Sequence, residues 1–106
     1  MDRSEFVRRL VLNSICDDYE NIDQIILPEV AKDGAKCGLT IERSEVVDAL
    51  AWLIADGMAT AYLLSSTGPS VELPGMPPVD EVEEYFKTYF YITKKGMDLH
   101  LSDDTW

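Results

Sequence analysis

The chain has few of the residues from which most enzyme and metal sites are built. Among its 106 residues are two cysteines, Cys16 and Cys37, and a single histidine, His100. The cysteines form no Cys-x-x-Cys pair and His100 is distant from both, so the spacing of a zinc site is lacking. We therefore expect no metal and no cofactor, with both cysteines reduced, half-buried and unreactive.

Motifs of catalysis and membrane insertion are also missing. There is no phosphate-binding glycine loop, no Gly-x-Ser-x-Gly motif, and no nucleophile at motif spacing from His100. No apolar run approaches the roughly 18 residues of a membrane span, and residues 1–16 lack the features of a secretory signal. These absences predict a cytoplasmic, non-enzymatic protein with no membrane contact and no evident small-molecule substrate.

Positive charge is scarce as well. Nine Lys and Arg stand against twenty Asp and Glu, a formal net charge of −11 at pH 7. Only residues 1–16 are locally basic, through Arg3, Arg8 and Arg9. An acidic chain meets DNA slowly and has few cations to neutralise phosphates, so its charge disfavours DNA as a partner.

The apolar residues predict one domain with three helices in its first half. A hydrophobic content of 46% is enough for one core. Residues 2–16 read as a helix that Asp2 or Ser4 can cap, and Asp2 with Glu5 resembles a capping box. Residues 22–37 form a second candidate, which Pro28 either kinks or restarts, and which Gly34 or Gly38 ends.

The third helix follows from residue 40. Thr40 is the expected N-cap, Val46, Leu50, Leu53 and Ile54 share one face, and Gly57 is placed for a left-handed C-cap. The segment ATAYLLS then predicts a strand.

The remaining third is turn-rich at first and regular later. Residues 66–78 hold four of the five prolines, so we expect no regular structure there. Residues 79–87 have helical spacing, residues 89–93 predict a second strand, and Thr93 caps a last helical turn.

This order resembles the winged helix-turn-helix superfamily. Two groups of residues carry the resemblance, a helix–glycine–strand unit and an aromatic-x-Thr-x-x-Gly pattern: Thr40, Val46, Ala49, Leu50, Leu53, Gly57, Met58 and Ala59, then Tyr91, Ile92, Thr93, Gly96 and Leu99. The resemblance implies a mostly helical α+β fold, with a three-helix bundle, a two-stranded β wing with a long acidic insertion, and a short C-terminal helix. The single domain, 1–106, would divide into 1–64 with the helical core and first wing strand, 65–88 with the wing insertion, and 89–106 with the second strand and terminal turn.

In that superfamily the third helix lies in the major groove and the wing contacts the DNA backbone. The resemblance places the reading face near Arg43, Ser44, Glu45, Val47, Asp48, Ala51 and Trp52, and the wing residues at Glu72, Asp80, Glu81, Glu83 and Glu84. Here the sequence departs from a DNA-reading pattern, because these positions offer mostly carboxylates and Arg43 is the only arginine. Trp52 either anchors a basic partner or packs under the wing or first helix.

Two features outside the third helix leave similar choices. The acids Asp17, Asp18, Glu20 and Asp23 lack the glycine and closing glutamate of a calcium loop, so a solvated turn is favoured. The aromatic run Tyr85, Phe86, Tyr89, Phe90 and Tyr91 suits core and cross-strand packing, and its outward rings would suit a dimer or partner surface.

Two functions from different classes follow. The first is a non-catalytic adaptor whose third helix and wing bind a basic protein surface, or a second copy of the chain. The alternative is a dimeric DNA-binding transcriptional regulator, which would need folding to gather its scattered cations into one patch: Arg3, Arg8, Arg9, Lys32, Lys36 and Arg43.

Overall fold

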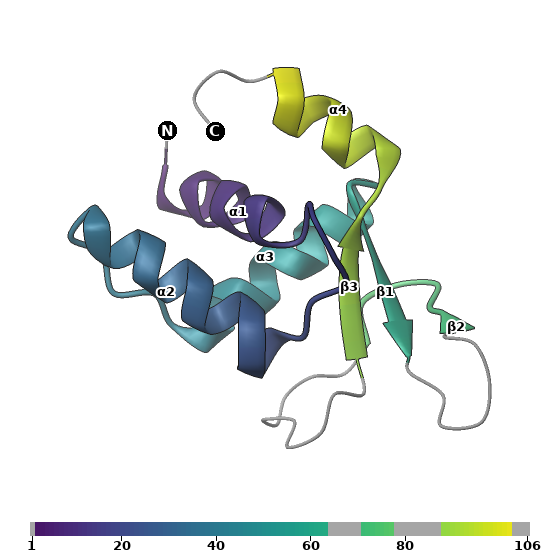
Figure 1. The fold of residues 1–106 in the computed structure, drawn as a ribbon, viewed down its shortest axis with the longest axis horizontal. Coiled ribbons are helices and arrows are strands. Elements are labelled where there is room, and N and C mark those ends of the chain that lie inside the picture. Colours follow the sequence, from purple (N-terminus) through teal and green to yellow (C-terminus); the bar gives the residue numbers. More distant parts are fainter. Residues whose placement is uncertain (1, 64–70, 78–87, 103–106) are drawn as a thin grey trace.

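The computed structural model describes residues 2–63, 71–77 and 88–102 (Figure 1). The helices are α1 (Arg3–Ser14), a π-helical turn (Ile22–Ile26), α2 (Leu27–Lys36), α3 (Arg43–Ala55) and α4 (Lys94–Ser102), and the strands are β1 (Ala59–Leu63), β2 (Val71–Glu72) and β3 (Thr88–Ile92). Figure 1 shows α1, α2 and α3 grouped together, with the sheet beside them. The mostly helical α+β architecture expected from the sequence is confirmed.

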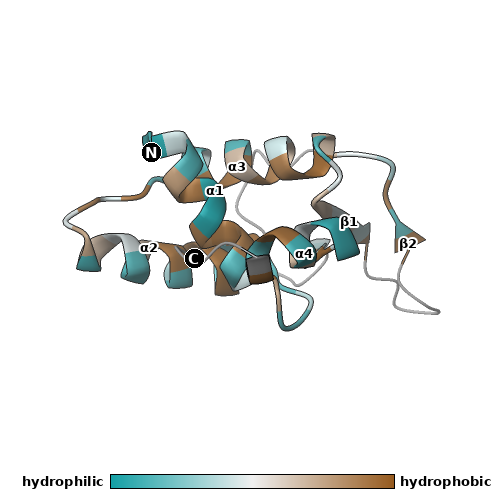
Figure 2. Ribbon diagram, turned by 90° about the horizontal axis from the view of Figure 1, so that it is seen from above, coloured by the Kyte–Doolittle hydropathy of each residue, from teal (hydrophilic) through white to brown (hydrophobic). Residues whose placement is uncertain are grey.

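Helix α1 packs against α2, α3 and α4. The Asp2 side chain caps it by accepting from the Glu5 N–H at 2.8 Å, as the capping box predicts. Val7, Val11 and Leu12 are buried, whereas Asn13 is exposed. Figure 2 shows that hydrophobic and hydrophilic residues both occur along each helix. Such a mixture lets a helix bury one face and expose the other.

Pro28 lies in the first turn of α2, but the helix does not start afresh there. Asn21 caps a π-helical turn that continues directly into α2 at Leu27, and Ile26 and Leu27 both have the αR conformation. Asn21 is also buried and donates to the Thr88 carbonyl at 3.1 Å, which ties this turn to β3. Gly38, at φ +75°, ends α2, whereas Gly34 is buried within the helix.

The expected start of the third helix is wrong by two residues. Helix α3 begins at Arg43 after Glu42, not after Thr40. The physical reason is Ile41, which is buried next to Gly34 and keeps the chain out of the helix at that point. The end is as predicted: Gly57 has φ +76°, and the Met58 N–H donates to the Leu53 carbonyl at 2.8 Å.

The sheet has one strand more than the two expected. β1 pairs antiparallel with β3, from Ala59↔Ile92 to Leu63↔Thr88. The expectation of no regular structure in 66–78 is wrong, because β2 pairs with β1 through Tyr62↔Glu72 and Leu63↔Val71. The order is β2-β1-β3. The helix expected over 79–87 lies outside the described residues.

Helix α4 is fastened to the end of α3. The Thr93 hydroxyl accepts from the Gly96 N–H at 3.1 Å, the predicted cap, and donates to the Gly57 carbonyl at 2.6 Å. Lys95 Nζ donates to the Asp56 carbonyl at 2.7 Å. At Gly96, α4 lies so close to the residues that follow α3 that an added Cβ would collide with the Met58 carbonyl.

Replacing Gly96 with alanine should therefore destabilise the fold. Because the colliding Met58 atom is backbone, the clash can be relieved only by moving α4, at a cost of roughly 1–3 kcal/mol. The matched control is Gly75→Ala, where no atom lies within 4 Å of the new Cβ. Urea denaturation should show a lower midpoint for Gly96→Ala alone; equal midpoints would contradict the close packing.

Candidate functional site

Helix α3 and helix α1, which packs against it, form the candidate site. Val46, Ala49, Leu50 and Leu53 are buried in the core. Ser44, Asp48 and Trp52 are exposed, and Glu45, Val47 and Ala51 are partly buried. The structure thus places most of the predicted reading face at the surface, but it separates Arg43 from the rest.

Arg43 faces the π-helical turn and forms an ion pair there. Its Nε donates to Asp23 Oδ1 at 2.7 Å and its Nη2 to Asp23 Oδ2 at 3.2 Å. The Asp23 side chain is only 7% exposed, so breaking this ion pair would remove the arginine's charge from a buried carboxylate. The one arginine that the sequence placed near the reading face is therefore part of the scaffold.

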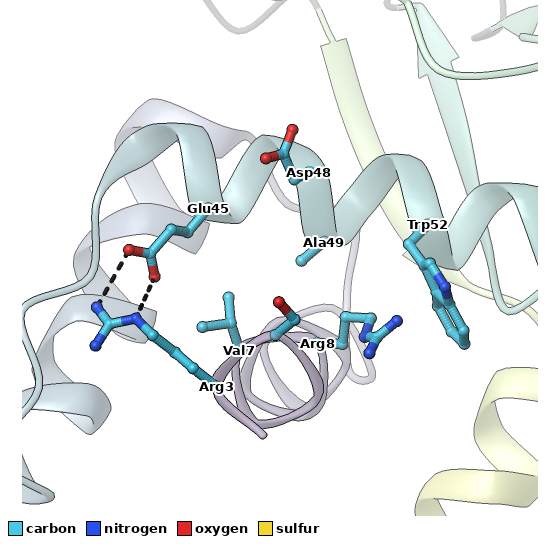
Figure 3. A pocket seen from close by; sticks show the side chains of 8 residues that line it. Arg3, Val7, Arg8, Glu45, Asp48, Ala49 and Trp52 are labelled. Carbon is cyan, nitrogen blue, oxygen red and sulfur yellow. Dashed lines mark hydrogen bonds and ion pairs between the residues drawn. The ribbon is translucent and has the colours of Figure 1, made fainter. Parts of the chain in front are cut away.

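The Arg3 side chain of α1 reaches the first turn of α3. Its Nε donates to Glu45 Oε2 at 3.2 Å, and its Nη2 donates to Glu45 Oε1 at 3.1 Å and to the Thr40 carbonyl at 2.6 Å. In Figure 3, Glu45 extends toward Arg3 while Asp48 projects from the other side of α3. Glu45 is thus neutralised within the chain, whereas Asp48 reaches the surface.

Trp52 lies against α1. From the sequence we expect it, if packed, to lie under the wing or against the first helix, and the structure shows the second position. The Arg8 guanidinium carbon is 4.1 Å from the centre of its ring, a cation–π contact. The indole nevertheless remains 46% exposed. It is therefore held in place and still available for contact.

A groove of about 440 Å³ runs between α1 and α3 (Figure 3). Its lining combines residues of both helices: Arg3, Ser4, Val7, Arg8, Glu45, Asp48, Ala49 and Trp52. Arg8 and Trp52 also line a hollow of about 290 Å³ toward Met58 and Leu99. Sequence reasoning missed the α1 half of this groove, although the basic face of the first helix was a signal that it had an outward role.

The wing contributes one described residue to the predicted site. Glu72 is exposed on β2. Asp80, Glu81, Glu83 and Glu84 lie outside the described residues. In the part of the chain that is described, no three His, Cys, Asp or Glu side chains are arranged to hold a metal, and no helix is long and apolar enough to cross a membrane.

Most of the cations invoked for DNA binding contact the chain's own side chains. Five of the six do so: Arg3 with Glu45, Arg8 with Trp52, Arg9 with Glu5, Lys36 with Asp33 and Arg43 with Asp23. They lie on α1, α2 and α3. Folding therefore engages these five cations in contacts within the chain.

Removal of Arg43 should destabilise the protein more than removal of Arg3. Arg43→Met leaves the buried Asp23 carboxylate without its cation, which should cost about 2 kcal/mol or more. Arg3→Met is the control, since Arg3 is 48% exposed and its pair should contribute less than about 1 kcal/mol. Equal losses in urea denaturation would contradict a scaffold role for Arg43.

The two cysteines should differ in reactivity. Both are free, but Cys16 is buried and Cys37 is exposed, so the expectation of two half-buried thiols is wrong. Burial, followed by the adjacent Asp17 carboxylate, raises the pKa of the Cys16 thiol and suppresses its thiolate. Iodoacetamide at pH 8 should label Cys37 first, as read by peptide mass spectrometry; faster labelling of Cys16 would contradict its burial.

Comparison with known proteins supports the fold and little more. No model of a known protein family matches the chain. No curated protein shows significant similarity. The structure is similar to a PadR-like transcription factor from Bacteroides fragilis, solved by X-ray crystallography, with a TM-score of 0.56 and 12% sequence identity, over 94% of this chain and 78% of that chain. The chain therefore has the winged-helix fold that its sequence predicts.

Proposed function

We propose that this chain is a non-enzymatic, cytoplasmic regulatory module that binds a basic protein surface through the α1–α3 groove and the outer face of α3. One observation carries the proposal. Arg3, Arg8 and Arg43 are each engaged by the chain's own side chains, whereas Asp48 and Trp52 are exposed. The face that a winged helix would present to DNA has an uncompensated carboxylate at its centre.

Electrostatics argue against phosphate contact through this face. Affinity for duplex DNA comes largely from Lys and Arg that displace counterions at phosphates. Turning Arg43 outward would separate the buried Asp23 from this cation, and turning Arg3 outward would free Glu45 as a second carboxylate. Each rearrangement would make DNA binding less favourable, because an ion pair within the chain must break before the arginine can reach a phosphate.

The same face has the chemistry of a protein-binding site. Tryptophan is enriched among the side chains that contribute most to protein interfaces, and Trp52 is already fixed by Arg8. Asp48 adjoins it in the groove and would meet a Lys or Arg of the partner. A net charge of −11 would also speed encounter with a basic protein.

A DNA-binding regulator is the second candidate, and one specific observation favours it. The structurally similar protein is a PadR-like transcription factor, which supports DNA binding more directly than any comparison supports protein binding. Under this alternative the chain would act as a dimer whose α3 face meets DNA, with cations outside that face contacting the phosphates.

Charge reversal at Asp48 separates the two candidates, because they predict opposite signs. If α3 binds a basic protein, Asp48→Lys should weaken the complex by about tenfold or more, as for a charge pair at an interface. If α3 faces DNA, the new ammonium should strengthen binding to a random duplex pool and steepen its salt dependence. Asp98→Lys, an exposed position on α4, is the control with the same charge change.

The protein arm uses nuclease-treated lysate passed over the immobilised chain. Partners retained by the wild type and by Asp98→Lys, but lost with Asp48→Lys and Trp52→Ala, would then be purified and titrated. The DNA arm uses fluorescence anisotropy of the duplex pool at low salt. A gain in duplex binding for Asp48→Lys, with no partner lost, would reject the protein-binding proposal in favour of the second candidate.

A further inference from the structure

The outer face of the sheet has an aromatic surface that the groove does not include. Ala59, Ala61, Phe90 and Ile92 are buried on the inner face. Because side chains alternate along a strand, Tyr62 of β1 and Tyr89 and Tyr91 of β3 lie on the opposite face. All three are partly exposed.

Tyr19 extends this surface from outside the sheet. Glu20 pairs with Phe90 at the free edge of β3, through backbone hydrogen bonds of 3.0 and 2.9 Å. This bridge places the Tyr19 ring 4.6 Å from that of Tyr91 and 5.2 Å from that of Tyr62, between ring centres. Tyr19 is 49% exposed, so the three packed rings present aromatic area to the surroundings.

Two carboxylates, those of Glu72 and Asp18, lie beside these rings. Glu72 pairs with Tyr62 across the strands, so its side chain emerges on the same face. Asp18 accepts from the Tyr19 N–H at 2.7 Å.

None of the ion pairs in the described residues includes Asp18 or Glu72. The negative charge beside the rings is therefore not compensated by the described part of the chain. A ligand for this face should be cationic and should have a flat surface that can stack on tyrosine.

We propose that the tyrosine face, defined as Tyr19, Tyr62 and Tyr91 with Glu72 and Asp18 beside them, docks an arginine-containing segment of a protein partner. Guanidinium is planar, stacks on aromatic rings and binds carboxylates through two parallel hydrogen bonds. Lysine offers the charge without the plane. A second copy of this acidic chain lacks the charge complementarity, and nucleic acid phosphates would be repelled by the carboxylates.

The test uses two peptides of equal charge, acetyl-Arg-Gly-Arg-amide and acetyl-Lys-Gly-Lys-amide, titrated into the full chain and followed by NMR. The arginine peptide should shift the ring resonances of Tyr19, Tyr62 and Tyr91 and bind about three- to fivefold more tightly than the lysine peptide. Equal affinities with shifts spread over the whole chain would overturn the proposal, because net charge alone would explain them.

Variants assign the binding to this face. Tyr19→Ala and Glu72→Gln should each lower the affinity for the arginine peptide by about threefold or more, whereas Tyr19→Phe should preserve it, because the ring remains. Trp52→Ala, in the α1–α3 groove, should leave it unchanged. Amide spectra of each variant report whether the fold is intact.

Two further outcomes would overturn the inference. If the shifts instead concentrate at Trp52 and Arg8 and disappear in Trp52→Ala, the groove binds the peptide, and the proposed function stands without the tyrosine face. If single-stranded oligothymidine shifts the same tyrosine rings, the face stacks bases instead of guanidinium groups. The tyrosine face can thus fail while the groove proposal survives, and the reverse also holds.

Discussion

The packing of α1 against α3 is the contact on which the rest of the structure depends. One face of α1 is buried through Val7, Val11 and Leu12, and the facing side of α3 is buried through Val46, Leu50 and Leu53. The apolar contact also determines the polar surface, because it brings Arg3 to Glu45 and Arg8 to Trp52. Core and candidate site are therefore two sides of one helix pair, and the groove exists because the helices meet.

That arrangement separates the scaffold from the function usually associated with it. A winged helix positions its third helix to enter a groove of DNA, but here Arg43 supports a buried aspartate and Arg3 neutralises a glutamate. The similarity to a transcription factor is at 12% identity and is a statement about fold. A fold alone does not determine the partner, and we propose from the exposed Asp48 and Trp52 that α3 meets a cationic protein surface.

The sequence predicted elements wherever a local signal determined them. The Asp2 cap, the Gly57 stop and the Thr93 cap each depend on residues within one turn, and all three were correct. The start of α3 was missed because the burial of Ile41 next to Gly34 is a tertiary effect. Strand β2 was missed because its pairing with β1 spans a turn-rich segment with no local strand signal.

The candidate site was only half predictable for the same reason. Helical spacing correctly exposed Ser44, Asp48 and Trp52. The partners of Arg3 and Arg43 lie 42 and 20 residues away in sequence, so no pattern could assign them. The tyrosine face needed the Glu20–Phe90 bridge, which likewise joins distant segments.

Five of the six cations considered for DNA binding are held by the chain's own acids or by Trp52, and we propose that too little positive charge remains for phosphate. The most direct measurement is the affinity of the wild-type chain for a random duplex pool, taken from low to physiological salt. If the cations are held in this way, the chain should show no binding, even at low ionic strength where counterion release most favours it. Binding whose log affinity falls steeply and linearly with log salt would show that several phosphates are neutralised, which would contradict the engagement of the cations within the chain.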